Sequence, residues 1–509
     1  MQWDVGLGRA VAHTLLVSGG AAVLATALAV ILSYSIYFLR IPLGRLCAAA
    51  VSSMLLIPVY VQATAWSAGF GIQGWFRLSQ VDAARHPWWG IASVIWIHAV
   101  AALPACFLIL SWGWRRLRDG TYEQAWIEFG PRYVASRLVP RRLAPWIGSA
   151  LLWTFCMTQN DMVVTNLFQV PTLCESVYQQ VQFGKLRSGP IALSWLIAGL
   201  CGLTASLTAQ RIARKTRSEH VAPNGTWDPV QTGLTFPGIA MSLLAWGIVA
   251  LAVLLPWFGM AVRIGFEARM VDGQAVRSWS LTAVVSSLWH VADYRTEIGW
   301  SCSLAIWTTV ATMTLGLAAI TWIPIQRGSA WVIGAMVFLL ALPGPIVNLC
   351  VSWLFNTAMP PQLQFLSDQT LLAPIVALQT RCLPIAYGIL WLARMRFEAQ
   401  HKALLTIDRS LPARIRLWIW FRYARSAIAA SALACGMVAV GDLASYLLVQ
   451  PPGVTTVAMR MFDLLHYGIR NREASLALVL SALAAIPSWW LLRTNALLTP
   501  PSYGRDRPD

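Results

Sequence analysis

The sequence predicts an all-α polytopic membrane protein built from two homologous half-domains. Hydrophobic residues make up 57% of the 509 residues and charged residues only 12%, whereas soluble domains carry about 25% charged residues. The region around Asp161 also recurs around Asp442. Aligning these two aspartates pairs two further positions: Gln169 with Gln450, and Pro171 with Pro452. A duplication on this scale in so apolar a chain indicates two membrane half-domains around one central passage.

Eleven segments are apolar over the roughly 20 residues that a membrane-spanning helix needs. In chain order they are 11–39, 46–71, 89–112, 146–168, 190–208, 238–260, 298–323, 331–355, 371–393, 427–449 and 473–492. Five belong to the first half and six to the second, because 238–260 has no counterpart in the first half. We therefore expect a first half-domain at 1–209, a cytoplasmic linker at 210–237 and a second half-domain at 238–509.

The net charge of +17 comes almost entirely from arginine. Arginines and lysines concentrate in alternate loops and in the carboxyl-terminal tail, the loops being 40–45, 113–145, 209–237, 324–330 and 394–426. Cytoplasmic loops carry an excess of these residues, so we expect the amino terminus outside and the carboxyl terminus in the cytoplasm. Because the arginines stand between apolar spans, they indicate contact with a lipid bilayer and argue against a nucleic-acid partner.

The basic loop after the third predicted helix of the first half carries a recognisable motif. It resembles a loop of the permease subunits of ATP-binding-cassette importers, which reads Glu-Ala-Ala, three residues, Gly, nine residues, Ile-x-Leu-Pro and docks on the ATPase. Gln124 and Ala125, preceded by Glu123, stand at the Glu-Ala-Ala position. Gly130 matches the glycine, and Pro140 matches the final proline but comes three residues early. A glycine suits this place because it allows a tight turn between two short helices.

The equivalent loop of the second half departs further from the motif. Lys402 and Ala403 stand where the motif begins, and Asp408 replaces the glycine. An aspartate can cap the next helical turn, but it lacks the conformational freedom of glycine. The resemblance therefore implies two ATPase-coupling loops, of which the second is degenerate.

The second half contains the more specific resemblance. Several stretches are similar to the fused, two-half permeases of the ferric iron type: 341–345 (ALPGP), 440–443 (VGDL), 446–448 (YLL), 451–453 (PPG) and 462–468 (FDLLHYG). The resemblance covers most of the chain.

This family resemblance implies a type I importer permease fold in the bacterial inner membrane. It implies two ATP-binding-cassette ATPase subunits and a periplasmic substrate-binding protein as partners, with ATP and magnesium bound by the ATPases and no cofactor in this chain. It implies ferric iron as the substrate, with thiamine or another small solute as the alternative within the same family.

The sequence does not indicate an enzyme. The phosphate-binding pattern GxxxxGK[ST] does not occur, because the stretch 183–186 (FGKL) lacks both the first glycine and the hydroxyl residue. No catalytic constellation and no cluster of metal ligands is recognisable. We therefore expect a transport subunit that depends on a separate motor.

Three charged residues within the spans are candidates for lining the translocation path. Asp161 and Asp442 occupy equivalent places, where they either line a gate or cap and pack helices. Arg381 faces Ala101 in the alignment, so it either contacts an anionic ligand on one side of the path or is a paired structural arginine. His98 is a lone imidazole on an apolar face, which is most typical of a core or interface histidine.

Two other classes of protein remain as alternatives. An ion-coupled secondary transporter should contain acid–base pairs inside the membrane and unwound Gly/Pro segments in both halves. The prolines at 58, 104, 343 and 384 partly fit this alternative. A membrane-embedded transferase should contain clustered carboxylates or histidines at one membrane face, and the sequence repeats no such cluster.

Overall fold

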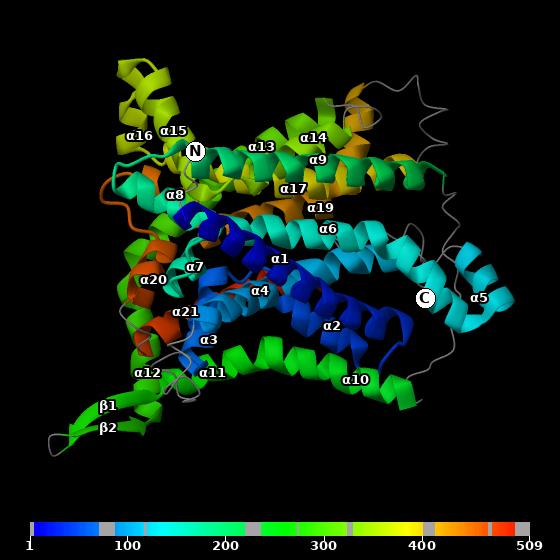
Figure 1. Ribbon diagram of the computed structural model, residues 1–509, viewed down its shortest axis with the longest axis horizontal. Helices are drawn as coiled ribbons and strands as arrows, with labels where there is room; N and C mark the ends of the chain where they lie inside the picture. Colours follow the sequence, from blue (N-terminus) through cyan, green and yellow to red (C-terminus); the bar gives the residue numbers. More distant parts are fainter. Residues whose placement is uncertain are drawn as a thin grey trace.

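The computed structural model of this protein describes residues 5–70, 87–116, 120–218, 236–271, 274–322, 329–400, 413–466 and 471–493. Figure 1 shows that helices dominate these residues, and the one sheet described among them is a two-stranded hairpin. Seven helices are long and apolar enough to cross a membrane. The protein is therefore an all-α polytopic membrane protein, apart from this hairpin.

The first half contains long helices joined by short helical segments. Its elements are α1 (Val5–Ser33), η1 (Tyr34–Phe38), α2 (Gly44–Ser53), α3 (Val59–Phe70), α4 (Pro87–Arg116), α5 (Gly120–Tyr133), η3 (Val134–Leu138), α6 (Val139–Asn160), α7 (Val163–Leu167), α8 (Leu173–Gln182) and α9 (Ser188–Ser218). Helix α9 continues past the expected domain boundary, so the first part of the predicted linker is helical. Residues 219–235 of that linker lie outside the described residues.

The second half repeats this order after one additional span and the hairpin. Its elements are α10 (Phe236–Val249), η4 (Ala250–Leu254), α11 (Leu255–Ile264), β1 (Phe266–Val271), β2 (Gln274–Trp279), α12 (Leu281–Trp289), η5 (His290–Tyr294), α13 (Arg295–Trp322), α14 (Ser329–Ala341), α15 (Gly344–Trp353), η6 (Leu354–Ala358), η7 (Pro361–Leu363), α16 (Phe365–Gln369), α17 (Leu372–Gln400), α19 (Ala413–Gly441), η8 (Leu447–Val449), α20 (Val457–His466) and α21 (Asn471–Arg493).

The candidate membrane spans cover eight of the eleven predicted ones. The seven unbroken candidates are Gly6–Phe38, Trp88–Trp114, Ser188–Ile212, Gly238–Ile264, Leu281–Trp322, Leu372–Met395 and Leu417–Gly441. The pair Ala330–Ala341 and Gly344–Ala358 makes an eighth if it crosses as one broken span. The predicted spans 46–71, 146–168 and 473–492 coincide with α2–α3, α6 and α21, which are helical but are not among these candidates. The number eleven therefore stays a prediction.

Each half forms a three-helix bundle, and each half also packs one interrupted helix against the other half. Helices α1, α4 and α6 pack together in the first half, and α13, α17 and α19 pack together in the second. Helix α14 of the second half lies against α9 of the first, and α2 and α3 of the first half lie against α21 of the second. The two halves are consequently intertwined and share one core.

The contact between α9 and α14 brings two backbones unusually close. A Cβ atom at Gly202 would lie 2.7 Å from the carbonyl oxygen of Gly334, and one at Gly334 would lie 2.8 Å from that of Gly202. Real Cβ atoms do not approach backbone oxygens so closely, so only glycine fits at these two places. Such approaches are typical of helix pairs in membranes, where small residues let the backbones meet.

Both exchanged elements are interrupted helices, and each interruption contains a proline of the repeat. Helices α14 and α15 are bent by 98° around Pro343, and α2 and α3 are separated by a segment that ends at Pro58. Proline lacks an N–H group and disfavours helical geometry in the preceding residue. Each break leaves backbone carbonyl groups without helical donors, so these groups need other partners.

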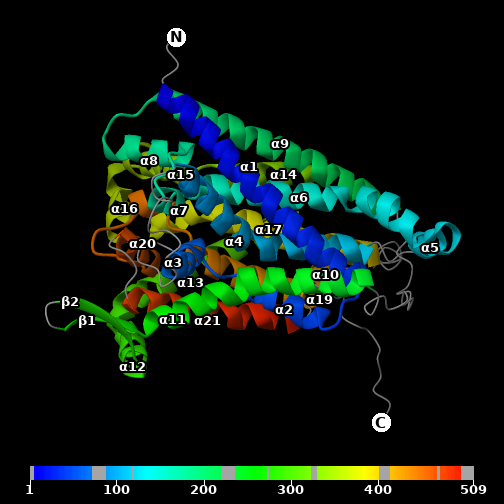
Figure 2. The ribbon, with the colours of Figure 1, turned by 60° about the horizontal axis from the view of Figure 1, so that its bottom comes forward.

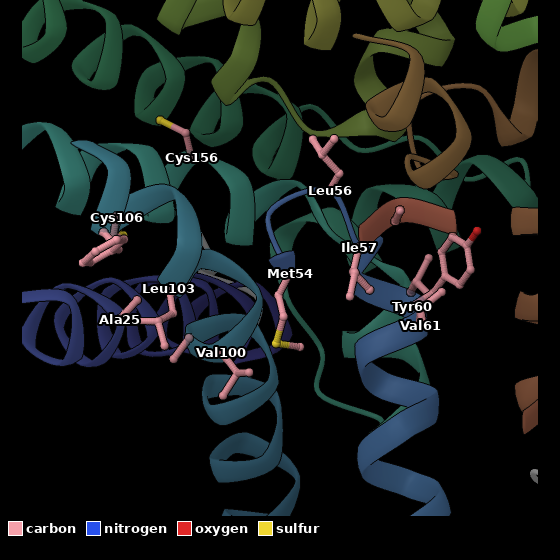
Figure 3. Packing of buried hydrophobic residues seen from close by; sticks show 14 of the residues in the cluster. Ala25, Met54, Leu56, Ile57, Tyr60, Val61, Val100, Leu103, Cys106 and Cys156 are labelled. Atoms are coloured by element: carbon pink, nitrogen blue, oxygen red, sulfur yellow. The ribbon is translucent and has the colours of Figure 1, made fainter. Parts of the chain in front are cut away.

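Buried apolar side chains from α1, α4 and the first break pack together near the middle of the molecule. Figure 3 shows Met54 of the break close to Val100 of α4, and Ile57 of the break close to Val61 of α3. All four are at most 7% exposed. The same continuous core includes Tyr446 and Met461 of the second half, so it holds the halves together as well as each half internally.

The two ends of the molecule differ in character. Figures 1 and 2 both place α5 at one end, and α8, α16, α20 and the hairpin at the opposite end. The hairpin pairs Phe266 with Trp279 and Val271 with Gln274 in antiparallel register. The sequence analysis did not foresee it, although the dipeptide Asp272-Gly273 between the strands is a strong hairpin signal.

Candidate functional site

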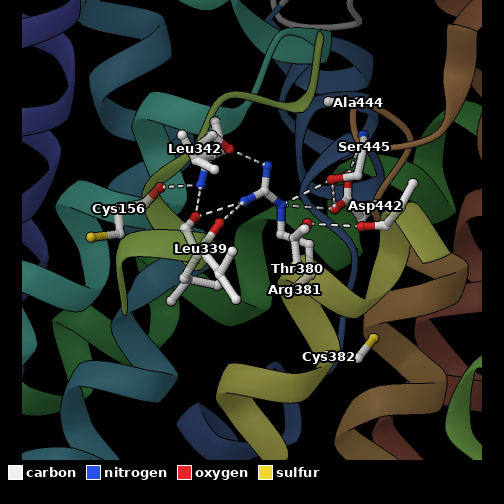
Figure 4. A network of polar contacts seen from close by, with 12 residues as sticks. Cys156, Leu339, Leu342, Thr380, Arg381, Cys382, Asp442, Ala444 and Ser445 are labelled. Carbon is white, nitrogen blue, oxygen red and sulfur yellow. Dashed lines mark hydrogen bonds and ion pairs between the residues drawn. The ribbon is translucent and has the colours of Figure 1, made fainter. Parts of the chain in front are cut away.

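A buried arginine holds the second break in place. Arg381 lies on α17 and is 2% exposed. Its Nη1 donates to the Leu340 carbonyl oxygen at 2.6 Å, and its Nη2 donates to the Leu342 carbonyl oxygen at 2.7 Å. Its Nε lies 2.9 Å from Oγ of Ser445 and 3.2 Å from Oδ2 of Asp442. The guanidinium group thus joins the open end of α14 to the end of α19, as Figure 4 shows.

The Asp442 carboxylate is the counter-charge for this arginine. Its Oδ1 accepts the Ser445 backbone N–H at 3.2 Å, and its Oδ2 accepts the Ser445 hydroxyl at 2.5 Å. A charge removed from water costs several kcal/mol unless a partner and hydrogen bonds replace the lost solvation. Here both requirements are met within the protein. The geometry therefore favours a paired structural arginine over one that awaits an anionic ligand.

Asp161 occupies the equivalent place in the first half and also caps the following turn. Its Oδ2 accepts the Val164 backbone N–H at 2.8 Å, and its Oδ1 accepts that of Val163 at 3.3 Å. A carboxylate at the start of a helix satisfies backbone donors that have no partner in the helix. Asp161 and Asp442 therefore both end a long helix and stabilise the turn that follows.

A basic residue accompanies the aspartate in each half. Nε2 of His98 on α4 lies 3.2 Å from Oδ2 of Asp161. His98 is 4% exposed, and its Nδ1 lies 2.8 Å from the Val94 carbonyl oxygen. It stands one helical turn before Ala101, the residue that aligns with Arg381. Both halves thus place a basic side chain from the third shared helix against the aspartate, although the two positions are not aligned.

The end of each fourth shared helix contacts the broken helix of the other half. Nε2 of Gln159 donates to the Ala341 carbonyl oxygen at 2.6 Å, and Nδ2 of Asn160 donates to that of Leu340. In the second half, a Cβ atom at Gly441 would lie 3.1 Å from Cβ of Pro58. The two breaks and the two aspartate-bearing helix ends therefore meet in one central junction.

The first predicted coupling loop lies at the far end of the molecule from the hairpin. Gln124 and Ala125 lie on α5, and Pro140 lies in the first turn of α6. Gly130 interrupts α5 with φ 74° and ψ 171°, a conformation that residues with a Cβ rarely adopt. The side chain of Glu123 lies outside the described residues, and so do residues 401–412 of the second coupling loop, which include Lys402, Ala403 and Asp408.

Three large apolar side chains are exposed on the two sides of Gly130, beside the exposed Glu128 and Arg132. Ile127 is 77% exposed, Phe129 is 58% exposed and Tyr133 is 45% exposed. The rings of Phe129 and Tyr133 lie 4.8 Å apart across the glycine. Large apolar side chains gathered on an exposed segment are typical of interaction surfaces.

Sequence reasoning placed Asp161, Asp442 and Arg381 in one site, and the structure brings them together at the junction of the halves. The sequence alone did not identify His98, Gln159, Asn160 or Ser445 as members of that site. For His98 the available signal was its position on the same helix as the equivalent of Arg381. The partners of Gln159 and Asn160 are backbone carbonyls about 180 residues away, and no sequence pattern identifies such contacts.

Among the described residues, no group of three or more histidine, cysteine, aspartate or glutamate side chains is arranged to hold a metal ion. The junction offers two acid–base pairs, two broken helices and a set of backbone carbonyls, which can position and separate helices. Comparisons with protein-family models, curated proteins and solved structures found no match to this chain.

Proposed function

We propose that this protein is the permease of an ATP-driven, binding-protein-dependent importer. In this proposal the chain crosses the bacterial inner membrane eleven times with a type I importer permease fold. Two separate ATP-binding-cassette ATPase subunits bind its coupling loops, and a periplasmic substrate-binding protein delivers the substrate to the other side. ATP and magnesium belong to the ATPases.

The observation that carries the proposal is the exposed α5 segment with its turn at Gly130. An amphipathic helix interrupted by a glycine, with Ile127, Phe129 and Tyr133 uncovered, suits insertion into a groove of a partner protein. The segment belongs to a loop that the distribution of arginine predicts to be cytoplasmic, where an ATPase would be located.

The intertwined halves supply the mechanical part of the proposal. Because α14 packs on α9 and α2 packs on α21, a displacement of either bundle must move an interrupted helix of the other half. The two breaks meet the ends of α6 and α19 at the central junction. A rocking motion driven from α5 would therefore reach the junction through α6, and the path would open and close between the two breaks.

Ferric iron is the substrate that the sequence motifs favour, and thiamine or another small solute is the alternative. The proposal assigns the amino terminus to the outside and the carboxyl terminus to the cytoplasm. A reporter fused after Arg217, at the end of α9, should then behave as cytoplasmic, and one inserted near Gly273 should behave as periplasmic. The reverse pattern would contradict both the orientation and the docking role of α5.

An ion-coupled secondary transporter is the second candidate, and specific contacts favour it. Both acid–base pairs, His98 with Asp161 and Arg381 with Asp442, lie inside the helical bundle. Both halves also contain a helix broken at proline. Discontinuous helices near buried charges are typical of ion-coupled transporters.

Purification from native membranes distinguishes the two candidates. An importer permease should co-purify with a separate ATPase, and uptake into proteoliposomes containing the complex should require ATP and persist without ion gradients. Uptake by the isolated chain that follows an ion gradient and ignores ATP would overturn the importer proposal in favour of the secondary transporter.

A further inference from the structure

Figures 1 and 2 place α8 and α20 at the end of the molecule opposite α5. There, three hydrogen-bonded side chains connect the first half to the second. Glu175 on α8 and Asn166 on α7 belong to the first half, and His466 at the end of α20 belongs to the second. Nδ2 of Asn166 donates to Oε1 of Glu175 at 2.7 Å. Oδ1 of Asn166 lies 2.6 Å from Nε2 of His466. The Asn166 amide therefore bridges a carboxyl group and an imidazole.

The geometry of these three side chains specifies how many protons His466 and Glu175 hold together. Nδ1 of His466 lies 2.8 Å from the Phe462 carbonyl oxygen, which can only accept, so Nδ1 carries a proton. Nε2 faces Oδ1 of Asn166, which is also an acceptor, so the ring needs a second proton. In this arrangement an imidazolium ion stands opposite a Glu175 carboxylate.

The alternative orientation of the amide leads to the same count. If the Asn166 amide is turned over, Nδ2 donates to a neutral His466 ring and Oδ1 faces Glu175. The Glu175 carboxyl group must then be protonated to make that hydrogen bond. In both arrangements Glu175 and His466 together hold one proton more than an ionised glutamate and a neutral histidine do.

The surroundings of Glu175 favour retention of this proton. The side chain is 3% exposed, and Nε2 of Gln179 donates to its Oε1 at 3.0 Å. Its Oε2 has no hydrogen-bond partner in the described part of the chain. Burial raises the pKa of the Glu175 carboxyl group above its ordinary value of 4.5, and the hydrogen bonds from Asn166 and Gln179 oppose this. A carboxyl group with a raised pKa stabilises the folded contact at low pH, and this contribution is lost as the pH rises.

We propose that the Glu175–Asn166–His466 bridge is a binding site for one proton and that this proton fastens the two halves together. Loss of the proton leaves a carboxylate and a neutral imidazole, and the lone pair of Nε2 then faces Oδ1 of Asn166. The bridge opens, and α20 separates from α7 and α8. This inference rests on the contacts between the halves and does not depend on ATP-driven import.

Other titratable groups lie on the elements of the bridge and on the helices near them. In the first half these groups are Asp161 before α7, Cys174 and Tyr178 of α8, and His13 of α1, whose ring contacts the Pro171 carbonyl oxygen. In the second half they are Asp463 of α20, the ion pair of Arg460 on α20 with Glu297 on α13, and Arg472 and Glu473 of α21. Of these groups, Asp161 raises the pKa of Glu175 through its charge, and His466 within the bridge lowers that pKa.

Linkage gives the expected size of the effect. In the open form both side chains are solvated, and above about pH 6.5 a solvated histidine is neutral while a solvated glutamate is ionised. The open form then holds one proton fewer than the closed bridge. The equilibrium constant for opening should therefore rise about tenfold for each pH unit, until the closed bridge itself loses the proton.

Hydrogen–deuterium exchange of the full-length protein in lipid nanodiscs measures this opening. We expect the protection of the α20 peptide 457–466, corrected for intrinsic exchange, to fall about tenfold per pH unit above about pH 6.5 in the wild type. His466→Gln offers an N–H group to Asn166 without titrating, so its protection should be independent of pH. His290→Gln is the matched control, because Nδ1 of His290 contacts the Ser286 carbonyl oxygen of its own helical segment, and it should behave as the wild type does.

Asn166→Ala tests the role of the amide in the bridge separately, because it leaves both titratable groups in place and removes the amide between them. It should abolish the pH dependence and lower protection at all pH values. Parallel pH profiles for the wild type and His466→Gln would overturn the proposal, and so would an Asn166→Ala profile that retains the wild-type slope.

Discussion

Nε of Arg381 lies 3.2 Å from Oδ2 of Asp442, and in the other half Nε2 of His98 lies 3.2 Å from Oδ2 of Asp161. An arginine side chain is permanently charged, whereas an imidazole is not. The second half therefore buries a permanent charge beside its aspartate, and the first half places an imidazole there.

This asymmetry predicts unequal costs for two equivalent substitutions. Asp442→Asn leaves the Arg381 guanidinium buried without a counter-charge, which should destabilise the protein by about 3–5 kcal/mol. Asp161→Asn should cost less, because His98 does not leave a permanent charge buried beside residue 161. Thermal unfolding of both variants in detergent measures the difference. Equal losses would show that the two pairs are energetically alike.

The role of the aspartates in the path gives a second prediction. If they line or control the path, the double variant with Asp161→Asn and Asp442→Asn should insert into the membrane but take up substrate poorly. The measurement is uptake into cells, normalised to the amount of inserted protein. Normal uptake by this variant would leave only the capping and packing roles that the structure shows directly.

The exchange of broken helices predicts a sharp difference between two glycines of α9. Gly202→Ala would place a Cβ atom 2.7 Å from the Gly334 carbonyl oxygen, which should destabilise the protein by about 1–3 kcal/mol through overpacking. Gly199→Ala is the matched control, since a Cβ atom there meets nothing within 4 Å. Unfolding temperatures should separate the two variants. A tolerated Gly202→Ala would argue against the close contact of α9 with α14.

The sequence allowed the repeat and most spans to be predicted, because these depend on local signals such as runs of apolar residues. The two breaks were not predicted, because Pro58 and Pro343 lie inside apolar runs just as Pro104 and Pro384 do, and the helices continue through the latter two. The equivalence of Asp161 and Asp442 also followed from the alignment. The exchange of α14 and α2 between the halves did not follow, because the repeat says which segments are alike and not which of them pack together.

The composition of the junction shows the same limit. Arg381 was visible as a charge inside a span, but its partners include carbonyl groups exposed by the break at Pro343, and backbone groups carry no sequence signal. His98 looked like an isolated core histidine because its partner is 63 residues further along the chain. The proton bridge was hidden for the same reason, since Asn166 and His466 are 300 residues apart.

Gly130 provides a prediction about the coupling segment. Gly130→Val forces a β-branched residue to adopt φ 74°, at a cost of about 1–3 kcal/mol of local strain. Insertion should be unaffected, because a Cβ atom at this glycine meets nothing within 4 Å. Association with the ATPase and uptake should fall together. A variant that transports normally would show that the turn at Gly130 is not needed for coupling.

The most direct test of the importer account is crosslinking from the coupling loops to a separate ATPase. Single cysteines replace Gln124 and Lys402 in turn, in a background in which the exposed Cys302 and Cys350 have been changed to serine. The account predicts that both cysteines crosslink to an ATPase subunit in native membranes. The crosslink from position 124 should be the stronger, because the second loop has Asp408 in place of the glycine. Intact uptake without a crosslink from either position would contradict the account and favour an ion-coupled transporter.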